Sequence, residues 1–507
     1  MASQSTKTKT IAKNAVFLYI RMIIVTIITL FTSRIVLREL GFEDYGLYNV
    51  VGGVVTLFAF LRSSMNSSTQ RFLSYEMGRG NLENLQNTFS TCLVAHLLIA
   101  FVLLLLAETV GLWFLNSQIV VPEGREVAAN WIYQFSVISL FVGIVSVPYS
   151  ADIVSNEKMG YFAFLGVLNA VLKLAIAYAI IISPIDKLIF YGFLLMFIDV
   201  IDLMLNWSYC NLKFHETHFR LFWDKEAFKK VFSFSGWTIW GQLAVVGSNQ
   251  GTNILVNMFY TVTANAAMGV GSQVNHAITG LVSNFQTAFK PQITKSYAEK
   301  NYDYLNKLVN YASKISFFLL FLVSFPIVLN IDYVLEIWLS KVPDFASEIC
   351  IVFIFASLCN AISAPLWMSI FATGNIKRYQ IAVSLVYVLE LIIIYIAFMM
   401  GATLVQGVFM KAVLNFVVIF VRVFYNHKEV ASFNIRDYVS KVVTPLMTIC
   451  IASYIVAFLI KLCFFNFMLQ LLLSVVLELL LILLCYRYGL DKQERDTFKR
   501  IIHKKKI

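Results

Sequence analysis

The chain has 507 residues, of which 59% are apolar and only 14% are charged. Soluble domains average about 45–50% apolar and about 25% charged residues, so this chain lacks the polar surface that a single soluble body needs. Its 44 Phe and only 8 Pro residues exclude a disordered scaffold. The net charge of +11 would suit a nucleic-acid partner or a membrane surface, and the positions of the charges decide between them. The composition predicts a polytopic membrane protein.

Fourteen stretches are long and apolar enough to cross a membrane, because a spanning helix needs about 20 mostly apolar residues. They run over residues 14–37, 45–68, 88–114, 129–152, 161–183, 188–210, 231–259, 264–288, 310–332, 346–372, 379–400, 403–425, 440–462 and 464–486. Their apolar runs are continuous rather than alternating, which excludes an outer-membrane barrel. We expect the first stretch to be retained as a helix, since it continues through Arg34 and Arg38 without a cleavage site. The predicted fold is all-α.

The basic residues concentrate on alternate loops between these spans. With a cytoplasmic N-terminus, 28 of the 40 Lys and Arg residues lie on the cytoplasmic side and six on the outer side. Lys and Arg are enriched in cytoplasmic loops, so both termini are predicted to be cytoplasmic. The basic tail, which ends in HKKKI, is then expected to contact anionic membrane lipid and not nucleic acid.

A charged cytoplasmic stretch, residues 211–230, divides the chain. The predicted domains are an N-terminal six-helix lobe (1–210), this inter-lobe loop (211–230), a C-terminal six-helix lobe (231–425), and two additional helices with the basic tail (426–507). His215 and His218 lie in the loop, but their spacing is not that of a zinc motif. The seven cysteines show no metal-ligand spacing either, so no metal or other cofactor is expected.

Two neighbouring spans carry polar residues along one helical face. The spacing predicts a shared face for Gln242, Asn249, Asn253 and Asn257 in one span, and for Ser272, His276, Thr279, Ser283 and Gln286 in the next. Hydrogen bonds between helices could use two or three such residues, so nine of them favour a water-filled cavity. Asn249, Asn253 and His276 are therefore candidate cavity residues. For His276, a structural hydrogen-bonded histidine is the open alternative.

Eight charged residues fall inside the predicted spans, where each needs water, a partner or a ligand. They are Arg21, Arg62, Lys173, Asp199, Asp202, Glu390, Lys411 and Glu478. Arg21, Arg62 and Lys411 are candidate cargo-binding residues, although snorkelling to the membrane surface is the alternative for the two arginines. Lys173, Asp199 and Asp202 are candidates for ion coupling or for a structural ion pair.

Cations together with amides and hydroxyls suit a pyrophosphate-linked sugar, because Arg and Lys bind phosphate and Asn, Gln and Ser bind sugar hydroxyls. An organic cation would instead need a carboxylate. No P-loop, G-x-S-x-G or metal cluster is present, so we expect no enzyme. Transport would then be driven by a gradient, by the membrane potential or by downstream consumption of the cargo.

Several short motifs resemble those of a known superfamily. They are KNAVFLYI in the first span, RELGFEDYGLYNVVGG at 38–53, NEKMGYFAFLGVLNAVLKL at 156–174, FSGW in the seventh span and ATGNIK at 372–377. With them the chain resembles a polysaccharide-type member of the multidrug/oligosaccharidyl-lipid/polysaccharide flippase superfamily, the branch of the O-antigen and capsule repeat-unit transporters.

The resemblance implies two six-helix lobes around a central cavity built by spans one, two, seven and eight, with two C-terminal helices that hold the lipid tail. It implies a bacterial inner-membrane protein that moves an undecaprenyl-pyrophosphate-linked oligosaccharide to the periplasmic leaflet by alternating access, for O-antigen or capsule assembly. The polysaccharide polymerase machinery is a further implied partner. Arg21 and Arg62 match, by span, the cavity arginines of related lipid II flippases. The alternative is a multidrug or organic-cation antiporter of the same fold, with Asp199 and Asp202 as its ion site.

Overall fold

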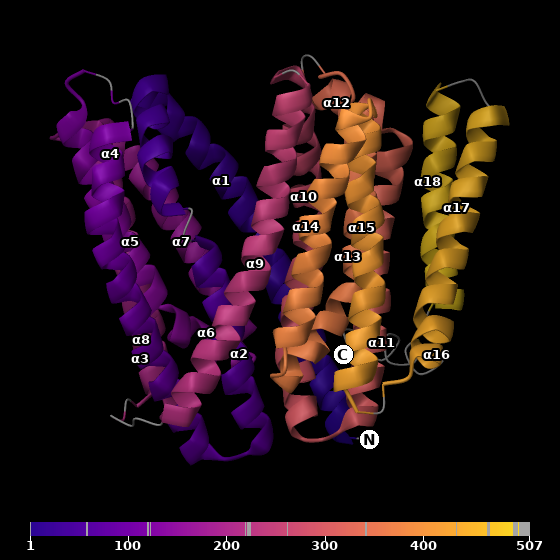
Figure 1. The fold of residues 1–507 in the computed structure, drawn as a ribbon, viewed down its shortest axis with the longest axis horizontal. Helices are drawn as coiled ribbons and strands as arrows, with labels where there is room; N and C mark the ends of the chain where they lie inside the picture. The colour runs from indigo at the N-terminus through magenta and orange to yellow at the C-terminus, as the bar shows by residue number, and fades with distance from the viewer. Residues whose placement is uncertain are drawn as a thin grey trace, which may run out of the picture. The chain divides into compact units, whose positions relative to one another are not determined.

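In the computed structural model the described residues are 2–56, 59–118, 121, 123–218, 220, 225–260, 262–339, 342–431, 433–463, 467–489 and 495. All regular secondary structure in these residues is helical, as predicted from the sequence (Figure 1). The basic tail beyond Arg495 lies outside them, as do residues 219 and 221–224 of the inter-lobe loop. Two compact units make up the chain: residues 12–239, and residues 1–11 with 240–507. The boundary lies inside a helix, and the domain limits drawn from the sequence remain predictions.

The unit of residues 12–239 contains ten complete helices, most of α1 (Ala2–Thr56) and the start of α9 (Lys225–Phe259) within its described residues. The ten are α2 (Ala59–Arg79), α3 (Leu82–Leu106), η1 (Ala107–Gly111), α4 (Leu112–Gln118), α5 (Glu126–Val145), α6 (Val147–Ser155), α7 (Met159–Ala179), η2 (Ile180–Ile182), α8 (Lys187–Lys213) and η3 (His215–Thr217). Helix α5 packs against α3 and α8, while α2 packs against α3 and α6.

The first two predicted spans meet at a kink inside α1. Gly41 has φ 76° and ψ 174°, a backbone conformation that glycine adopts without a Cβ clash. The connection predicted between residues 38 and 44 is therefore a single non-helical residue in an otherwise continuous helix.

A π-helical turn, η1, extends α3 towards α4. The hydroxyl of buried Tyr133, on α5, donates a hydrogen bond of 2.7 Å to the carbonyl of Ala107 in this turn. A Cβ on Gly111 would lie 2.0 Å from that hydroxyl, so the close packing of α5 on η1 requires glycine at this position. Ala107 and Tyr133 belong to the same apolar core as Val36, on α1, and Ile198, on α8.

The second unit consists of the start of α1, the rest of α9 and eleven further helices in its described part. They are α10 (Val262–Ala298), α11 (Tyr302–Leu329), α12 (Ile331–Trp338), α13 (Ala346–Thr373), α14 (Lys377–Met399), α15 (Leu404–Glu429), α16 (Ile435–Tyr438), η4 (Val439–Val443), α17 (Thr444–Cys463), α18 (Phe467–Leu484) and η5 (Cys485–Gly489). Helix α13 is the most buried, because α10, α11 and α15 all pack against it. Helices α17 and α18 pack on each other, and α18 contacts α11.

Ten segments of the described residues are long and apolar enough to cross a membrane. The other four predicted spans, 45–68, 231–259, 264–288 and 464–486, coincide with α1 and α2, α9, α10 and α18, apart from residues 57, 58 and 464–466, which are not described. Amides and hydroxyls lower the hydropathy of α9 and α10, because these are the helices with the predicted polar faces. Large apolar side chains such as Phe101 and Leu105 are half exposed, as lipid-facing residues would be.

Candidate functional site

In the unit that contains residues 240–507, Lys411 forms an ion pair within the membrane-spanning helices. Its Nζ lies 3.6 Å from Oε1 of Glu390, on the neighbouring helix α14, and donates a hydrogen bond of 2.6 Å to Oδ1 of Asn249 on α9. The sequence offered no neighbour for Lys411, and the structure supplies one from each of two helices. Two of the three side chains, Lys411 and Asn249, are predicted cargo-binding residues.

Glu390 is the buried member of this group. Its side chain is 0% exposed, against 14% for Lys411. Oε1 of Glu390 also accepts a hydrogen bond of 2.5 Å from the hydroxyl of Ser248, whereas its Oε2 is buried without a hydrogen-bond partner among the described residues. A carboxylate in this position is stabilised on one oxygen only.

The predicted polar face of α9 is accessible in the structure. The side chains of Asn249, Asn253 and Asn257 are exposed and that of Gln242 is partly exposed. Asn253 uses its amide nitrogen to donate to Oε1 of Gln250, on the same helix, at 3.1 Å. The side-chain oxygen of Asn253, Oδ1, has no hydrogen-bond partner among the described residues, so water or a ligand can bind it.

The polar face of α10 divides between exposed and packed residues. His276 and Ser283 are exposed, and Ser283 bonds to the backbone carbonyl of Gly280. Gln286 donates to the hydroxyl of Ser316 on α11 at 3.2 Å. Gln286 therefore serves helix packing, while His276 stays available to a ligand.

In the unit of residues 12–239, Arg21 lies against α7. Its guanidinium carbon is 4.7 Å from the ring centroid of Phe162, and its Nε would lie 2.2 Å from a Cβ on Gly166. Glycine at position 166 therefore leaves the space that the arginine occupies. Arg21 is partly exposed, and no carboxylate within the described residues lies within ion-pair distance of it.

Arg62, Lys173, Asp199 and Asp202 form no ion pair among the described residues. Arg62 is exposed and covers Gly143 of α5, with its Nη1 3.1 Å from the position of a Cβ there. Arg62, Asp199 and Lys173 are the charged groups whose fields reach Asp202. The carboxylate of Asp202 instead accepts a hydrogen bond of 3.1 Å from Asn206, one helical turn later. The ion pair between Lys173 and Asp199 that the sequence allowed does not form.

Sequence reasoning missed Arg422, a buried cation near the end of α15. Its Nη1 donates hydrogen bonds of 2.7 Å to Oδ1 of Asn360 and to the hydroxyl of Ser363, and its Nε donates to the hydroxyl of Tyr379 at 3.3 Å. The residue is 7% exposed, and all these partners are neutral. It joins α13, α14 and α15, which identifies it as a packing residue. An arginine three residues from the end of a predicted span was the available signal.

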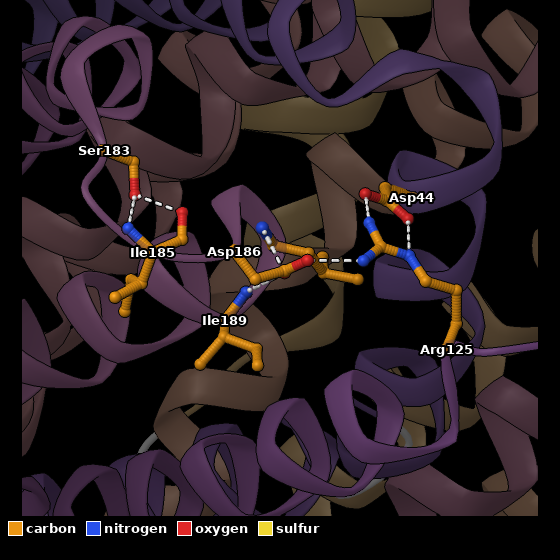
Figure 2. Close-up of polar contacts among 7 residues, drawn as sticks. Asp44, Arg125, Ser183, Ile185, Asp186 and Ile189 are labelled. Atoms are coloured by element: carbon orange, nitrogen blue, oxygen red, sulfur yellow. Dashed lines mark hydrogen bonds and ion pairs between the residues drawn. The ribbon is translucent and has the colours of Figure 1, made fainter.

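A second charged cluster joins three helices at the predicted outer side (Figure 2). Arg125, at the start of α5, binds both carboxylate oxygens of Asp44 on α1, with a distance of 2.7 Å from Nε to Oδ1, and also binds Asp186. Asp186 caps α8 by accepting from the backbone N–H groups of Leu188 and Ile189. Burial alone would raise the pKa of Asp186, but the N–H of Ile189 and the Arg125 guanidinium outweigh it and hold that pKa below its usual value. Arg125 is bound by two carboxylates, and Asp186 is used by Arg125 and by the start of α8. We therefore interpret the cluster as one that holds the three helices together.

The fold is that of MATE transporters. A multidrug resistance MATE family transporter of the MOP superfamily, in an outward-facing conformation, aligns with a TM-score of 0.70 and 15% identity over 84% of this chain and 96% of its own. A Vibrio cholerae MATE transporter aligns with a TM-score of 0.66 and 16% identity over 86% of this chain and 99% of its own. No protein-family model matches the chain, and no curated protein matches it significantly. The shared fold is the one that the resemblance implies, and the superfamily and its polysaccharide branch remain proposals.

Proposed function

We propose that the chain is a membrane transporter that moves an undecaprenyl-pyrophosphate-linked oligosaccharide from the cytoplasmic to the periplasmic leaflet by alternating access. The transport part of this proposal is supported by the fold, because the similar solved structures are described as transporters. Pyrophosphate, sugar and lipid are the three parts of the cargo for which the chain must supply contacts.

One observation carries the choice of an anionic cargo. Three basic side chains, Arg21, Arg62 and Lys173, lie on spanning helices and are at least partly exposed, without an ion pair among the described residues. Each charge is costly in hydrocarbon unless water or a ligand meets it. A pyrophosphate group would bind Arg by paired hydrogen bonds and Lys as a point charge.

The C-terminal helices of the chain bear on a lipid-linked cargo. Residues 426–507 carry α17 and α18, which pack on each other. In the resembled flippases two such additional helices hold the lipid tail, and we assign them the same role.

The second candidate is a multidrug or organic-cation antiporter, and the comparisons favour it over the first. The solved structures are described as MATE and multidrug resistance transporters, with no glycan named. Asp199 and Asp202 are partly exposed and unpaired with Lys173, so they would supply the carboxylates for a cation.

Charge reversal separates the two candidates. We expect Arg21→Glu to abolish display of the surface glycan in cells that depend on this chain, while Asp202→Asn has a milder effect. Arg34→Glu, on the exposed surface of the same helix, is the matched control and should keep display. If the cells export ethidium, and this export requires Asp202 but is unaffected by Arg21→Glu, the proposed cargo is wrong and an organic cation takes its place.

A further inference from the structure

The ion pair of Lys411 and Glu390 is unevenly buried and incompletely bonded. Glu390 is fully buried, Lys411 keeps 14% of its side chain exposed, and Asn249 beside it is exposed. The group therefore extends from an accessible surface at Asn249 to a closed interior at Glu390. One oxygen of the buried carboxylate, Oε2, is left without a hydrogen-bond partner among the described residues.

A buried carboxylate with a free oxygen has a simple way to become neutral, which is to bind a proton there. A structural ion pair would be expected to satisfy both oxygens, because a buried charge with missing hydrogen bonds is costly. Glu390 instead uses Oε1 for both Ser248 and Lys411 and leaves Oε2 open.

The surroundings of Glu390 contain one charge that opposes its protonation. Lys411, on α15, is the charged group that acts on it, and α9 contributes only the neutral Ser248 and Asn249. On its own helix, Tyr387 is the titratable neighbour. Among the described residues, Lys411 is thus the charged group that favours the ionised form of Glu390 over the protonated form.

We propose that Glu390 is the group that takes up a proton during the transport cycle, and that its protonation releases Lys411 to bind an anionic group of the cargo. A proton from water adds to the Glu390 carboxylate and makes it a neutral acid. Lys411 keeps its own proton throughout, so the charge of the pair changes from zero to plus one. The ammonium group, still held by Asn249, then attracts a phosphate oxygen. The second step rests on the proposed anionic cargo, whereas the first does not.

The proton step is tested by infrared titration of the full chain in lipid vesicles. Acidification should produce a carboxylic-acid carbonyl band that is lost in Glu390→Gln and kept in Glu336→Gln, the same change at an exposed glutamate. Lys411→Met should move the midpoint of this band to higher pH by about one to three units, because the opposing charge is gone. A band unaffected by Glu390→Gln, or a midpoint unmoved by Lys411→Met, overturns the proposal.

The anion step is tested with inorganic pyrophosphate at alkaline pH, where Glu390 of the wild type is ionised. Glu390→Gln mimics the protonated acid and should bind the probe about tenfold more tightly or better, since one cation is set free. Adding Lys411→Met to this variant should remove the gain. Equal binding by all three proteins overturns the anion step and weighs against the proposed cargo, while the infrared result decides the proton step independently.

Discussion

Replacing Lys411 with methionine should destabilise the protein by about 3–4 kcal/mol near neutral pH. Methionine keeps most of the unbranched apolar stem of the lysine and removes its charge together with the hydrogen bond to Asn249. At 3.6 Å and an effective dielectric constant of about 20, the ion pair with Glu390 contributes about 4–5 kcal/mol of Coulomb energy. The loss is limited because the abandoned carboxylate can bind a proton. Protonating a carboxyl group of ordinary pKa, about 4.3, costs about 3.7 kcal/mol at neutral pH.

This limit gives the prediction a pH dependence with a definite sign. Each unit by which the pH falls reduces the cost of protonation by about 1.4 kcal/mol. The destabilisation by Lys411→Met should therefore shrink to about 1 kcal/mol near pH 5. In the double variant with Glu390→Gln, which removes both charges, most of the stability should return.

The assay is unfolding of the purified chain in mixed micelles with a denaturing detergent, followed by tryptophan fluorescence at two pH values. Lys173→Met is the matched control, because Lys173 is exposed and has no ion pair among the described residues. Its effect should stay below about 1 kcal/mol. A loss in Lys411→Met that equals the control, or that is the same at both pH values, would refute the reasoning.

Three further predictions concern topology, Arg21 and the outer cluster. In a cysteine-free background, an impermeant thiol reagent on intact cells should label Glu123→Cys and spare Lys225→Cys; the reverse pattern would invert the predicted orientation. Gly166→Ala should impair transport at normal protein levels, because the new methyl group occupies the place of the Arg21 side chain; unchanged transport would remove Arg21 from the cargo site. Arg125→Ala should destabilise the fold fully above the usual aspartate pKa. Its effect should fade as the pH drops through the depressed pKa of Asp186, because that group stabilises the fold only while it is ionised. A loss independent of pH in unfolding experiments would contradict this.

The helical fold was predictable because spanning helices show directly in hydropathy. The predicted span positions coincide with helices of the described residues, including the four that are not among the ten apolar segments found there. Helices α9 and α10 are the informative cases. Their low hydropathy comes from the same amides and hydroxyls that indicated a polar face. These polar side chains make the span harder to recognise by hydropathy, and they also indicate a functional surface. The kink at Gly41 was not predictable, since a positive φ at one glycine leaves the apolar pattern unchanged.

The ion pair of Lys411 with Glu390 was harder to predict, because the sequence indicates the depth of the two residues in the membrane but not the directions in which their helices face. Glu390 and Lys411 lie at nearly equal distances before and after the short turn that joins α14 and α15, so they reach similar depth in two neighbouring helices. What the sequence lacks is the rotation of each helix about its axis, which packing against α9 and α13 determines. The same limit applies to Arg125, whose two carboxylate partners come from segments 81 and 61 residues away.

The most direct test of the proposed cargo is a translocation assay on the purified full chain in proteoliposomes. A fluorescent oligosaccharide linked to undecaprenyl pyrophosphate would be placed in both leaflets, and an impermeant quencher would report how much becomes accessible. We predict protein-dependent exposure of the labelled lipid that is lost in Arg21→Glu and retained in Arg34→Glu. No movement of this lipid, together with ethidium transport that requires Asp202 in the same vesicles, would contradict the proposal.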